Sequence, residues 1–198
     1  MTRLLNLVAV DGVNGRAVEA GAKALASAQH PARRAAVSAW DASGIFGELR
    51  HAGSDAGKPS ARTLLLLFAT DLAFRLRWEI RPALEEGRTV IAAPYVETAV
   101  AFGRAVGLDA AWLSSLFAFA PAAGSSWVVD DAPSRVQSQR GGFVEVGWEE
   151  VSRMLPGTTR LRFMARARLQ LASSARRNGT RTFASRLKSK ALQQRRRR

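Results

Sequence analysis

A glycine-containing turn near the N-terminus is the first place where this sequence could carry chemistry. The turn runs from Asp11 to Arg16 and follows the short apolar segment Leu4–Val10. A buried strand that ends in such a turn and continues into a helix presents backbone N–H groups to a phosphate. Gly12, Gly15 and Arg16 are therefore the candidate phosphate-binding residues.

The phosphate-binding loop pattern G-x-x-x-x-G-K-[ST] fails when it is laid over this turn from Gly12. Ala17 stands at the second glycine, Val18 at the lysine and Glu19 at the hydroxyl residue. Val18 cannot neutralise a phosphate, and Glu19 would repel one by about 4 kcal/mol per close pair of unit charges. Arg16 is a displaced cation that could reach a phosphate, and the alternative is a solvated arginine on a turn.

The elements that would position this turn alternate between strand and helix. We expect strands at 4–10, 35–40, 89–93 and 126–129. We expect helices at 17–29, 44–51, 61–86, 97–106, 109–120, 148–155 and 161–174, with Pro82 marking a kink or a new first turn. This order predicts an α/β fold of three layers around a parallel sheet.

Length and composition favour one domain, at 1–174, followed by a basic tail at 175–198. The chain has no cysteine, and His30 and His51 lie in polar segments, so we expect no metal site. We expect no signal peptide, because Asp11 interrupts the first apolar run, and no transmembrane span. The predicted location is the cytoplasm.

The net charge of +14 is concentrated in the C-terminal quarter. Residues 151–198 contain 15 basic residues and no acidic one, which leaves 15 basic and 16 acidic residues in 1–150. A polycationic segment binds nucleic acid through its phosphates, with steep salt dependence and little sequence preference. An anionic membrane surface is the rival partner, and compositional drift toward arginine is the third alternative. The candidate nucleic-acid contacts are Arg176, Arg177, Arg181, Arg186, Lys188, Lys190, Arg195, Arg196, Arg197 and Arg198.

Three further segments, LLLLFATDLAF, IRPALEEGRTVIAAPYVETAVAF and GLDAAWL, stand in the order and spacing typical of thymidylate kinases. The likeness is concentrated in Leu64–Leu113 and extends over 4–140. The chain therefore resembles the thymidylate kinase family, which implies a P-loop nucleoside monophosphate kinase fold and a homodimer.

The resemblance also shows which kinase residues are missing. The D-R-Y motif of the family becomes Ala93-Pro94-Tyr95, and its F-x-x-x-R motif becomes Phe68 followed by Leu72. Both substitutions remove an arginine, and the first also removes an acid. Phosphoryl transfer depends on positioning and on neutralising phosphate charge, so these losses favour a protein without kinase activity.

A base-binding pocket is the feature that the resemblance leaves in place. It implies base contacts from Phe68, Thr98 and Phe102, with Tyr95 at the family's tyrosine. The alternative is that these residues are packed in the core, because they are apolar residues at helical spacing.

The expected function is that of a non-catalytic binding or scaffold protein with a thymidylate-kinase-like fold and no cofactor. Two alternatives stay open. One is an active dTMP or nucleotide kinase that uses ATP, magnesium and displaced residues such as Arg16. The other is a nucleic-acid-binding module in which the basic C-terminus does the work.

Overall fold

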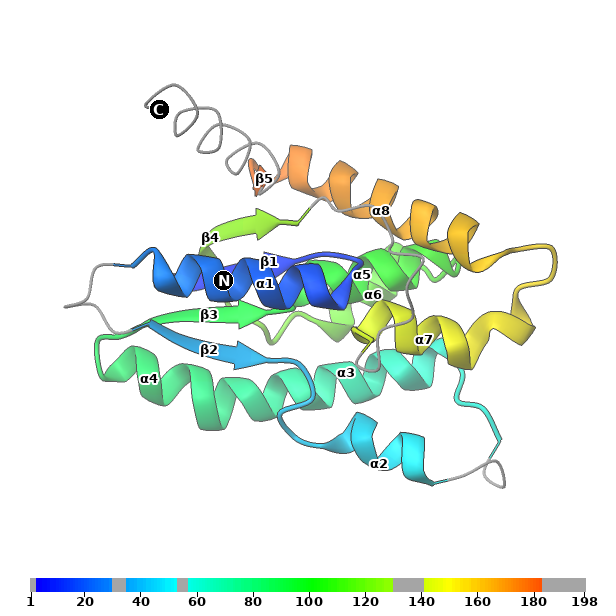
Figure 1. Cartoon of the computed structure of the whole chain (residues 1–198), viewed down its shortest axis with the longest axis horizontal. Coiled ribbons are helices and arrows are strands. Elements are labelled where there is room, and N and C mark those ends of the chain that lie inside the picture. The colour runs from blue at the N-terminus through cyan, green and yellow to red at the C-terminus, as the bar shows by residue number, and fades with distance from the viewer. Residues whose placement is uncertain (1–2, 30–34, 53–56, 130–140, 183–198) are drawn as a thin grey trace, which may run out of the picture.

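A computed structural model describes residues 3–29, 35–52, 57–129 and 141–182 of the chain (Figure 1). Five strands pair in parallel to form one sheet, in the order β2-β3-β1-β4-β5. The strands are β1 (Arg3–Asp11), β2 (Ala35–Ala39), β3 (Thr89–Ala93), β4 (Ala122–Val128) and β5 (Arg181–Thr182). The parallel sheet confirms the α/β prediction.

Helices connect the strands and cover both faces of the sheet. The first half of the described chain contains α1 (Gly15–Ser27), α2 (Ile45–His51), α3 (Ala61–Arg75), the π-helical segment η2 (Leu76–Ile80) and α4 (Arg81–Glu85). The second half contains α5 (Val96–Ala105), α6 (Ala110–Leu116), α7 (Phe143–Val151), the short 3-10 segment η3 (Ser152–Met154) and α8 (Arg160–Arg177).

The central strands are apolar on both sides, because each side packs against helices. In β1, Val10 packs with Val18 and Leu25 of α1 on one face. Leu7 and Ala9 belong to the larger core on the other face, which α3, α5, α7 and α8 complete. This arrangement gives the three predicted layers and places the carboxyl end of β1 between α1 and the larger core.

The long predicted helix at 61–86 divides into α3, η2 and α4. Pro82 lies in the first turn of α4, where its missing N–H group costs no helical hydrogen bond. Gly87 follows with a φ of +75°, a left-handed conformation that ends the helix. Both local predictions are confirmed.

Several boundaries in the C-terminal half differ from the predicted ones. Strand β4 begins at Ala122 and not at 126, and α6 ends at Leu116 and not at 120. The helix predicted at 148–155 begins instead at Phe143, because Gly142 and Glu145 form its N-terminal cap. Helix α8 continues through Ala175, which is buried, and β5 then pairs with β4. Residues 175–182 are therefore part of the folded body, and the strand β5 is absent from the prediction because two residues carry no periodicity.

Candidate functional site

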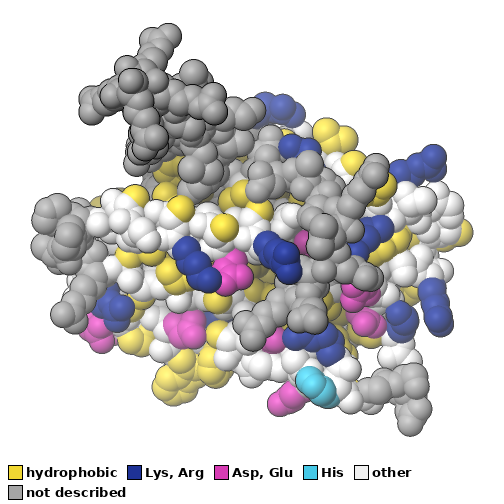
Figure 2. Space-filling view, viewed as in Figure 1, with side chains coloured by type: hydrophobic (Ala, Val, Ile, Leu, Met, Phe, Trp, Pro, Cys, Tyr) yellow, Lys and Arg dark blue, Asp and Glu magenta, His cyan; other side chains and the backbone are white. Residues whose placement is uncertain are grey.

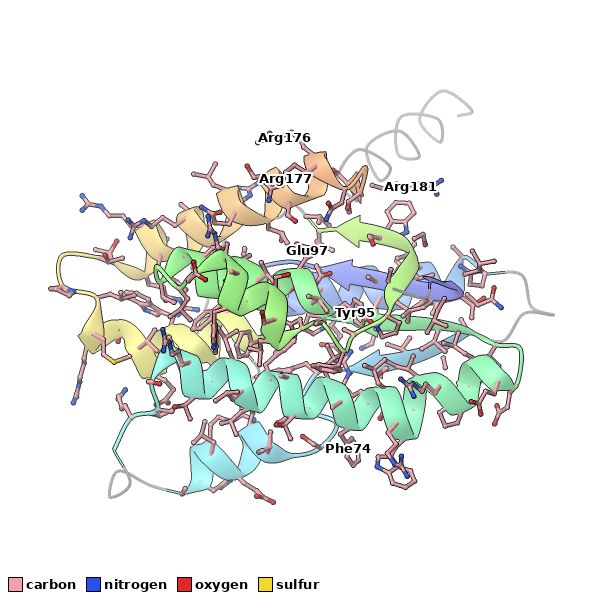
Figure 3. The ribbon with its side chains drawn as sticks, turned by 180° about the vertical axis from the view of Figure 1, so that it is seen from behind. Phe74, Tyr95, Glu97, Arg176, Arg177 and Arg181 are labelled. Carbon is pink, nitrogen blue, oxygen red and sulfur yellow. The ribbon has the colours of Figure 1, made fainter. Side chains whose placement is uncertain are left out.

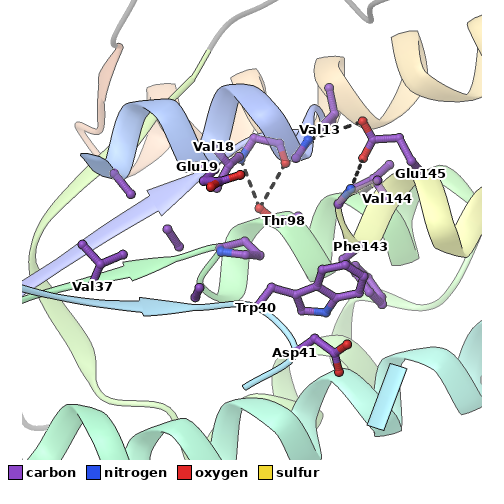
Figure 4. Close-up of a pocket in the computed structure, with 18 of the residues that line it drawn as sticks. Val13, Val18, Glu19, Val37, Trp40, Asp41, Thr98, Phe143, Val144 and Glu145 are labelled. Atoms are coloured by element: carbon purple, nitrogen blue, oxygen red, sulfur yellow. Dashed lines mark hydrogen bonds between the residues drawn. The ribbon is translucent and has the colours of Figure 1, made fainter. Parts of the chain in front are cut away.

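A cavity of about 590 Å³ lies at the carboxyl edge of the sheet, where β1, β2 and β3 end (Figure 4). Ligands of open α/β sheets bind at this edge. Its lining includes the glycine turn, the first turns of α1 and the N-terminal end of α7. The apolar part of the lining comes mainly from Val13, Val18, Val37, Trp40, Pro94 and Phe143.

A series of buried hydrogen bonds through Thr98 and Asp11 holds the glycine turn in place. The Gly12 N–H group donates to Thr98 Oγ1 at 3.1 Å, and the Thr98 hydroxyl donates to Asp11 Oδ1 at 2.7 Å. The same oxygen accepts the N–H groups of Tyr95 and Thr98, both at 2.9 Å. Burial of Asp11 raises its pKa to about 6, although these hydrogen bonds act in the opposite direction.

Three of the first four N–H groups of α1, those of Gly15, Ala17 and Val18, are bonded within the protein. Asn14 is the N-cap, and its Oδ1 accepts from the Ala17 N–H group at 3.2 Å. The Val18 N–H group donates to the Asn14 carbonyl at 3.0 Å. The Gly15 N–H group donates to Glu145 Oε1 at 3.3 Å, as Figure 4 shows. A phosphate at this turn would have to compete with side chains of the protein for these donors.

Glu145 reaches the turn from α7 and bonds to two backbone segments. Its second oxygen, Oε2, accepts the Gly142 N–H group at 2.9 Å. Burial raises the pKa of this carboxyl, while the hydrogen bonds from Gly15 and Gly142 act to lower it. The side chain is 9% exposed, so it is a buried acid with partners on both oxygens.

Val18 occupies the lysine position of the phosphate-loop pattern, and it is a core residue. Its side chain is buried against the sheet with Val10 and Leu25. Its Cγ2 would lie 2.7 Å from a Cβ atom on Gly12, so the glycine is needed for this packing. Glu19, at the hydroxyl position, lies on the exposed side of the same helical turn.

Four of the five charged side chains among the described residues that line the cavity form two pairs of opposite sign, and the fifth is Glu145. Lys23 bonds to Glu19 at 2.6 Å, and Arg50 lies 3.9 Å from Asp41. In Figure 2, basic and acidic side chains lie side by side over the face that carries α1. Arg16 is exposed and is not among the described residues that line the cavity.

In contrast to Arg16, Arg75 is buried next to the ends of β2 and β3. Arg75 is fully buried, donates to the Ser38 hydroxyl at 3.0 Å and to the Pro94 carbonyl at 2.9 Å, and lies 3.7 Å from Asp71. Burial lowers its pKa, and Asp71 and Glu79 act against that shift. This arginine fixes the strand ends and does not reach the cavity lining.

The four predicted base-pocket residues occupy different environments. Phe68 and Phe102 are fully buried and pack against Phe143, with ring centroids 4.6 and 5.0 Å away. The Tyr95 hydroxyl donates to the Pro121 carbonyl at 2.7 Å. Thr98 lines the cavity and bonds to Asp11. Phe68 and Phe102 are therefore core residues, as the alternative interpretation states, and they are not among the described residues that line the cavity.

Most residues that line this cavity were not predicted from the sequence, among them Trp40, Asp41, Phe143 and Glu145. The acid three residues after Gly142 was a usable signal, because a glutamate at that spacing caps a helix start. Phe143 contacts Trp40 from another element, with ring centroids 6.4 Å apart. No local pattern reports that contact.

The described part of the C-terminal basic segment is exposed. Arg176 and Arg177 end α8, and Arg181 lies on β5 with its guanidinium 5.5 Å from the centre of the Trp127 ring (Figure 3). The other candidate contacts, Arg186, Lys188, Lys190 and Arg195–Arg198, lie outside the described residues. Within the described ranges, no helix is long and apolar enough to cross a membrane, and no cluster of three potential metal ligands occurs.

An open parallel sheet whose first strand runs through a glycine turn into a helix defines the P-loop NTPase-like class of α/β folds. A thymidylate kinase from Ehrlichia chaffeensis has a similar structure, with a TM-score of 0.59 over 89% of this chain and 85% of that one, at 15% identity. That likeness establishes the fold.

Sequence comparison points to the same family. Probable thymidylate kinases from Pyrococcus horikoshii and Pyrococcus abyssi are 42% identical over 67 residues and 37% identical over 73 residues. These matches cover 34% and 37% of this chain and 33% and 36% of the two relatives. The chain therefore matches about a third of the length of these relatives. No protein-family model matches the chain. The chain is thus similar to thymidylate kinases in sequence over about a third of its length and has a P-loop NTPase-like fold, and the predicted resemblance is confirmed.

Proposed function

We propose that this chain is a thymidylate-kinase-like protein that has lost phosphate binding and phosphoryl transfer and acts as a non-catalytic binding or scaffold protein. The observation that carries the proposal is the environment of Val18. The position that a kinase fills with lysine is here a buried valine that packs between α1 and the sheet and forms part of the apolar wall of the cavity.

The surroundings of Val18 support the same conclusion. A nucleotide brings several negative charges, and kinases neutralise them with cations, magnesium and backbone donors. Here Lys23 and Arg50 each lie beside an acid, and Glu145 accepts the Gly15 N–H group. ATP and magnesium therefore do not fit the residues at this turn. The missing acid and arginine at Ala93 and Pro94 add to the mismatch.

The active-kinase alternative depends on Arg16, which is exposed outside the described lining of the cavity. Calorimetric titration with ATP-magnesium, thymidine monophosphate and thymidine tests both proposals. We expect no heat of binding from ATP-magnesium. Tight ATP binding together with turnover would contradict the non-catalytic proposal, and loss of that turnover in Arg16→Gln would identify the displaced cation.

Nucleic-acid binding is a second candidate function, and the charge of α8 and the following residues favours it. The exposed arginines of α8 include Arg162, Arg166, Arg176 and Arg177, and residues 151–198 contain no acid. Such a surface binds a phosphate backbone through release of counterions.

A variant shortened to end after Thr182 keeps every described element and removes residues 183–198. It therefore separates the contribution of α8 from that of the residues that follow. We expect the full chain to bind single- or double-stranded oligonucleotides with an affinity that falls steeply between 50 and 200 mM salt. We expect the shortened chain to bind more weakly and with a smaller salt slope. Fluorescence anisotropy measures both quantities, and equal affinity for vesicles of anionic and neutral lipid rules out the membrane alternative.

A further inference from the structure

The N-terminal end of α7 lies directly on the glycine turn, although Gly15 and Glu145 are 130 residues apart in the sequence. A Cβ atom at Gly15 would lie 2.3 Å from the backbone nitrogen of Gly142, and one at Gly142 would lie 2.5 Å from the Gly15 Cα atom. The two backbones are therefore in van der Waals contact. Only glycine at both positions allows it.

Glu145 joins the two backbones through one carboxylate. Oε1 accepts from Gly15 at 3.3 Å, and Oε2 accepts from Gly142 at 2.9 Å. A carboxylate carries the negative charge and the acceptor oxygens of a small oxyanion, and the N-terminus of α1 favours negative charge at this place. With 9% of its surface exposed, the side chain is well shielded from water.

The Gly15 N–H group is one of the donors that an external anion would use. In this class of fold the backbone N–H groups of the glycine turn and the helix start bind phosphate. Gly12 and Ala17 donate to Thr98 and Asn14, which belong to the turn and its support. The Gly15 N–H group donates instead to an acid from a distant helix, so this contact is the one that can be exchanged for a ligand without unfolding α1.

We propose that Glu145 is an internal anion that occupies the Gly15 donor, holds the end of α7 on the glycine turn and keeps external oxyanions out. The contact is autoinhibitory with respect to anion binding. This inference rests on the proposed loss of phosphate binding, since it identifies the group that closes the turn. It also gives Glu145 a part in blocking phosphate that is separate from the substitutions at Val18 and Glu19.

The experiment compares the wild type with Glu145→Gln and Glu145→Ala, with Glu149→Gln as the matched control. Glu149 lies on the same helix with an exposed side chain, so its substitution removes the same charge away from the turn. Amide exchange followed by nuclear magnetic resonance reports on the Gly15 N–H group. Calorimetric titration with inorganic pyrophosphate, without magnesium, reports on anion binding.

We expect the Gly15 amide to exchange at least about tenfold faster in both Glu145 variants than in the wild type and in Glu149→Gln, because a charge-assisted hydrogen bond is lost. We also expect Glu145→Ala to bind pyrophosphate at least about tenfold more tightly than the wild type, which is the coupling expected for direct competition.

Three results would overturn the proposal. Rapid exchange of Gly15 in the wild type would show that the contact is absent, and this measurement needs no variant. Unchanged exchange in both Glu145→Gln and Glu145→Ala would show that the carboxylate does not hold the turn, since glutamine by itself keeps one acceptor oxygen. Faster exchange of the Gly15 amide in Glu145→Ala without tighter pyrophosphate binding would show that the contact is structural and does not exclude anions. Tight ATP-magnesium binding by the wild type would instead contradict the proposed function.

Discussion

The region around the glycine turn and the outer face of α8 use charge in opposite ways. Near the turn, Asp11, Glu145 and Arg75 are buried and have several hydrogen-bond partners each. Along α8, arginines such as Arg162 and Arg166 extend into solvent on a segment that contains no acid. At the cavity the cations Lys23 and Arg50 each lie beside an acid, whereas the segment that forms α8 contains several arginines and no acid. The difference shows that the same residue type, arginine or lysine, is neutralised by nearby acids around the cavity and left exposed along α8.

The largest effect is expected from Arg75→Met. The substitution leaves Asp71 and Glu79 without a buried cation, and breaking such a network typically costs about 3–5 kcal/mol. Arg77→Met is the control, because Arg77 is exposed above the Trp78 ring, where the loss is below about 1 kcal/mol. Urea denaturation measures both. Equal losses would mean that the burial of Arg75 carries no energetic weight.

Val18→Lys tests whether the kinase lysine can be restored. A lysine buried in the apolar layer between α1 and the sheet has its pKa lowered by about 3 units, which corresponds to about 4 kcal/mol at neutral pH. Ala20→Lys, on the exposed side of the same helix, is expected to change stability little. Val18 also forms part of the cavity wall. A stable Val18→Lys variant that binds ATP-magnesium would therefore show that a lysine here leaves the apolar layer and reaches a phosphate, which would contradict the expected loss of stability.

Asp11→Asn tests the buried acid below the glycine turn. The pKa of Asp11 rises from its ordinary value of 3.8 to about 6 on folding, so the native state holds the proton more tightly. The cost of ionisation therefore grows as pH rises from about 4 to 6 and amounts to about 3 kcal/mol above that range. Asparagine keeps an acceptor oxygen for Tyr95 and Thr98 and carries no charge.

The measurement is the free energy of unfolding at pH 4.5 and pH 7 for the wild type and for Asp11→Asn. In the wild type, ionisation of Asp11 lowers the free energy of unfolding between these two pH values. We expect most of this decrease to be absent in Asp11→Asn. Asp109→Asn is the control, because a hydrogen bond from the Trp112 N–H group lowers the pKa of that exposed N-cap below its ordinary 3.8, so its contribution is lost only below about pH 4 and stays nearly constant between pH 4.5 and 7. Identical pH profiles for Asp11→Asn and the wild type would contradict the raised pKa.

The smallest effect on stability is expected from the double substitution Arg162→Gln and Arg166→Gln. Both side chains are exposed, so the free energy of unfolding should change by less than about 0.5 kcal/mol. Under the nucleic-acid proposal, each lost phosphate contact lowers the salt slope by about 0.9. Arg77→Gln with Arg81→Gln removes the same charge elsewhere. Equal weakening by both pairs would mean that net charge, and not the face of α8, governs binding.

Much of the fold was predictable because its signals are local. The apolar run before Asp11, the break at Gly87 and the position of Pro82 each reflect backbone and burial requirements within a few residues. The failure of the phosphate-loop pattern at Val18 and Glu19 was also readable from the sequence alone. The predictions failed where the signal was short or distant, as for β5 and for the start of α7 at Phe143.

The sequence by itself determined the order of strands and helices, the kinship to thymidylate kinases and the uneven distribution of charge along the chain. Only the tertiary structure decided that Phe68 and Phe102 pack against Phe143, and that Glu145 bonds to Gly15. The physical reason is that periodicity reports which face of an element is buried. It does not report which distant side chain meets that face, and that partner decides whether a glycine turn is open to a phosphate.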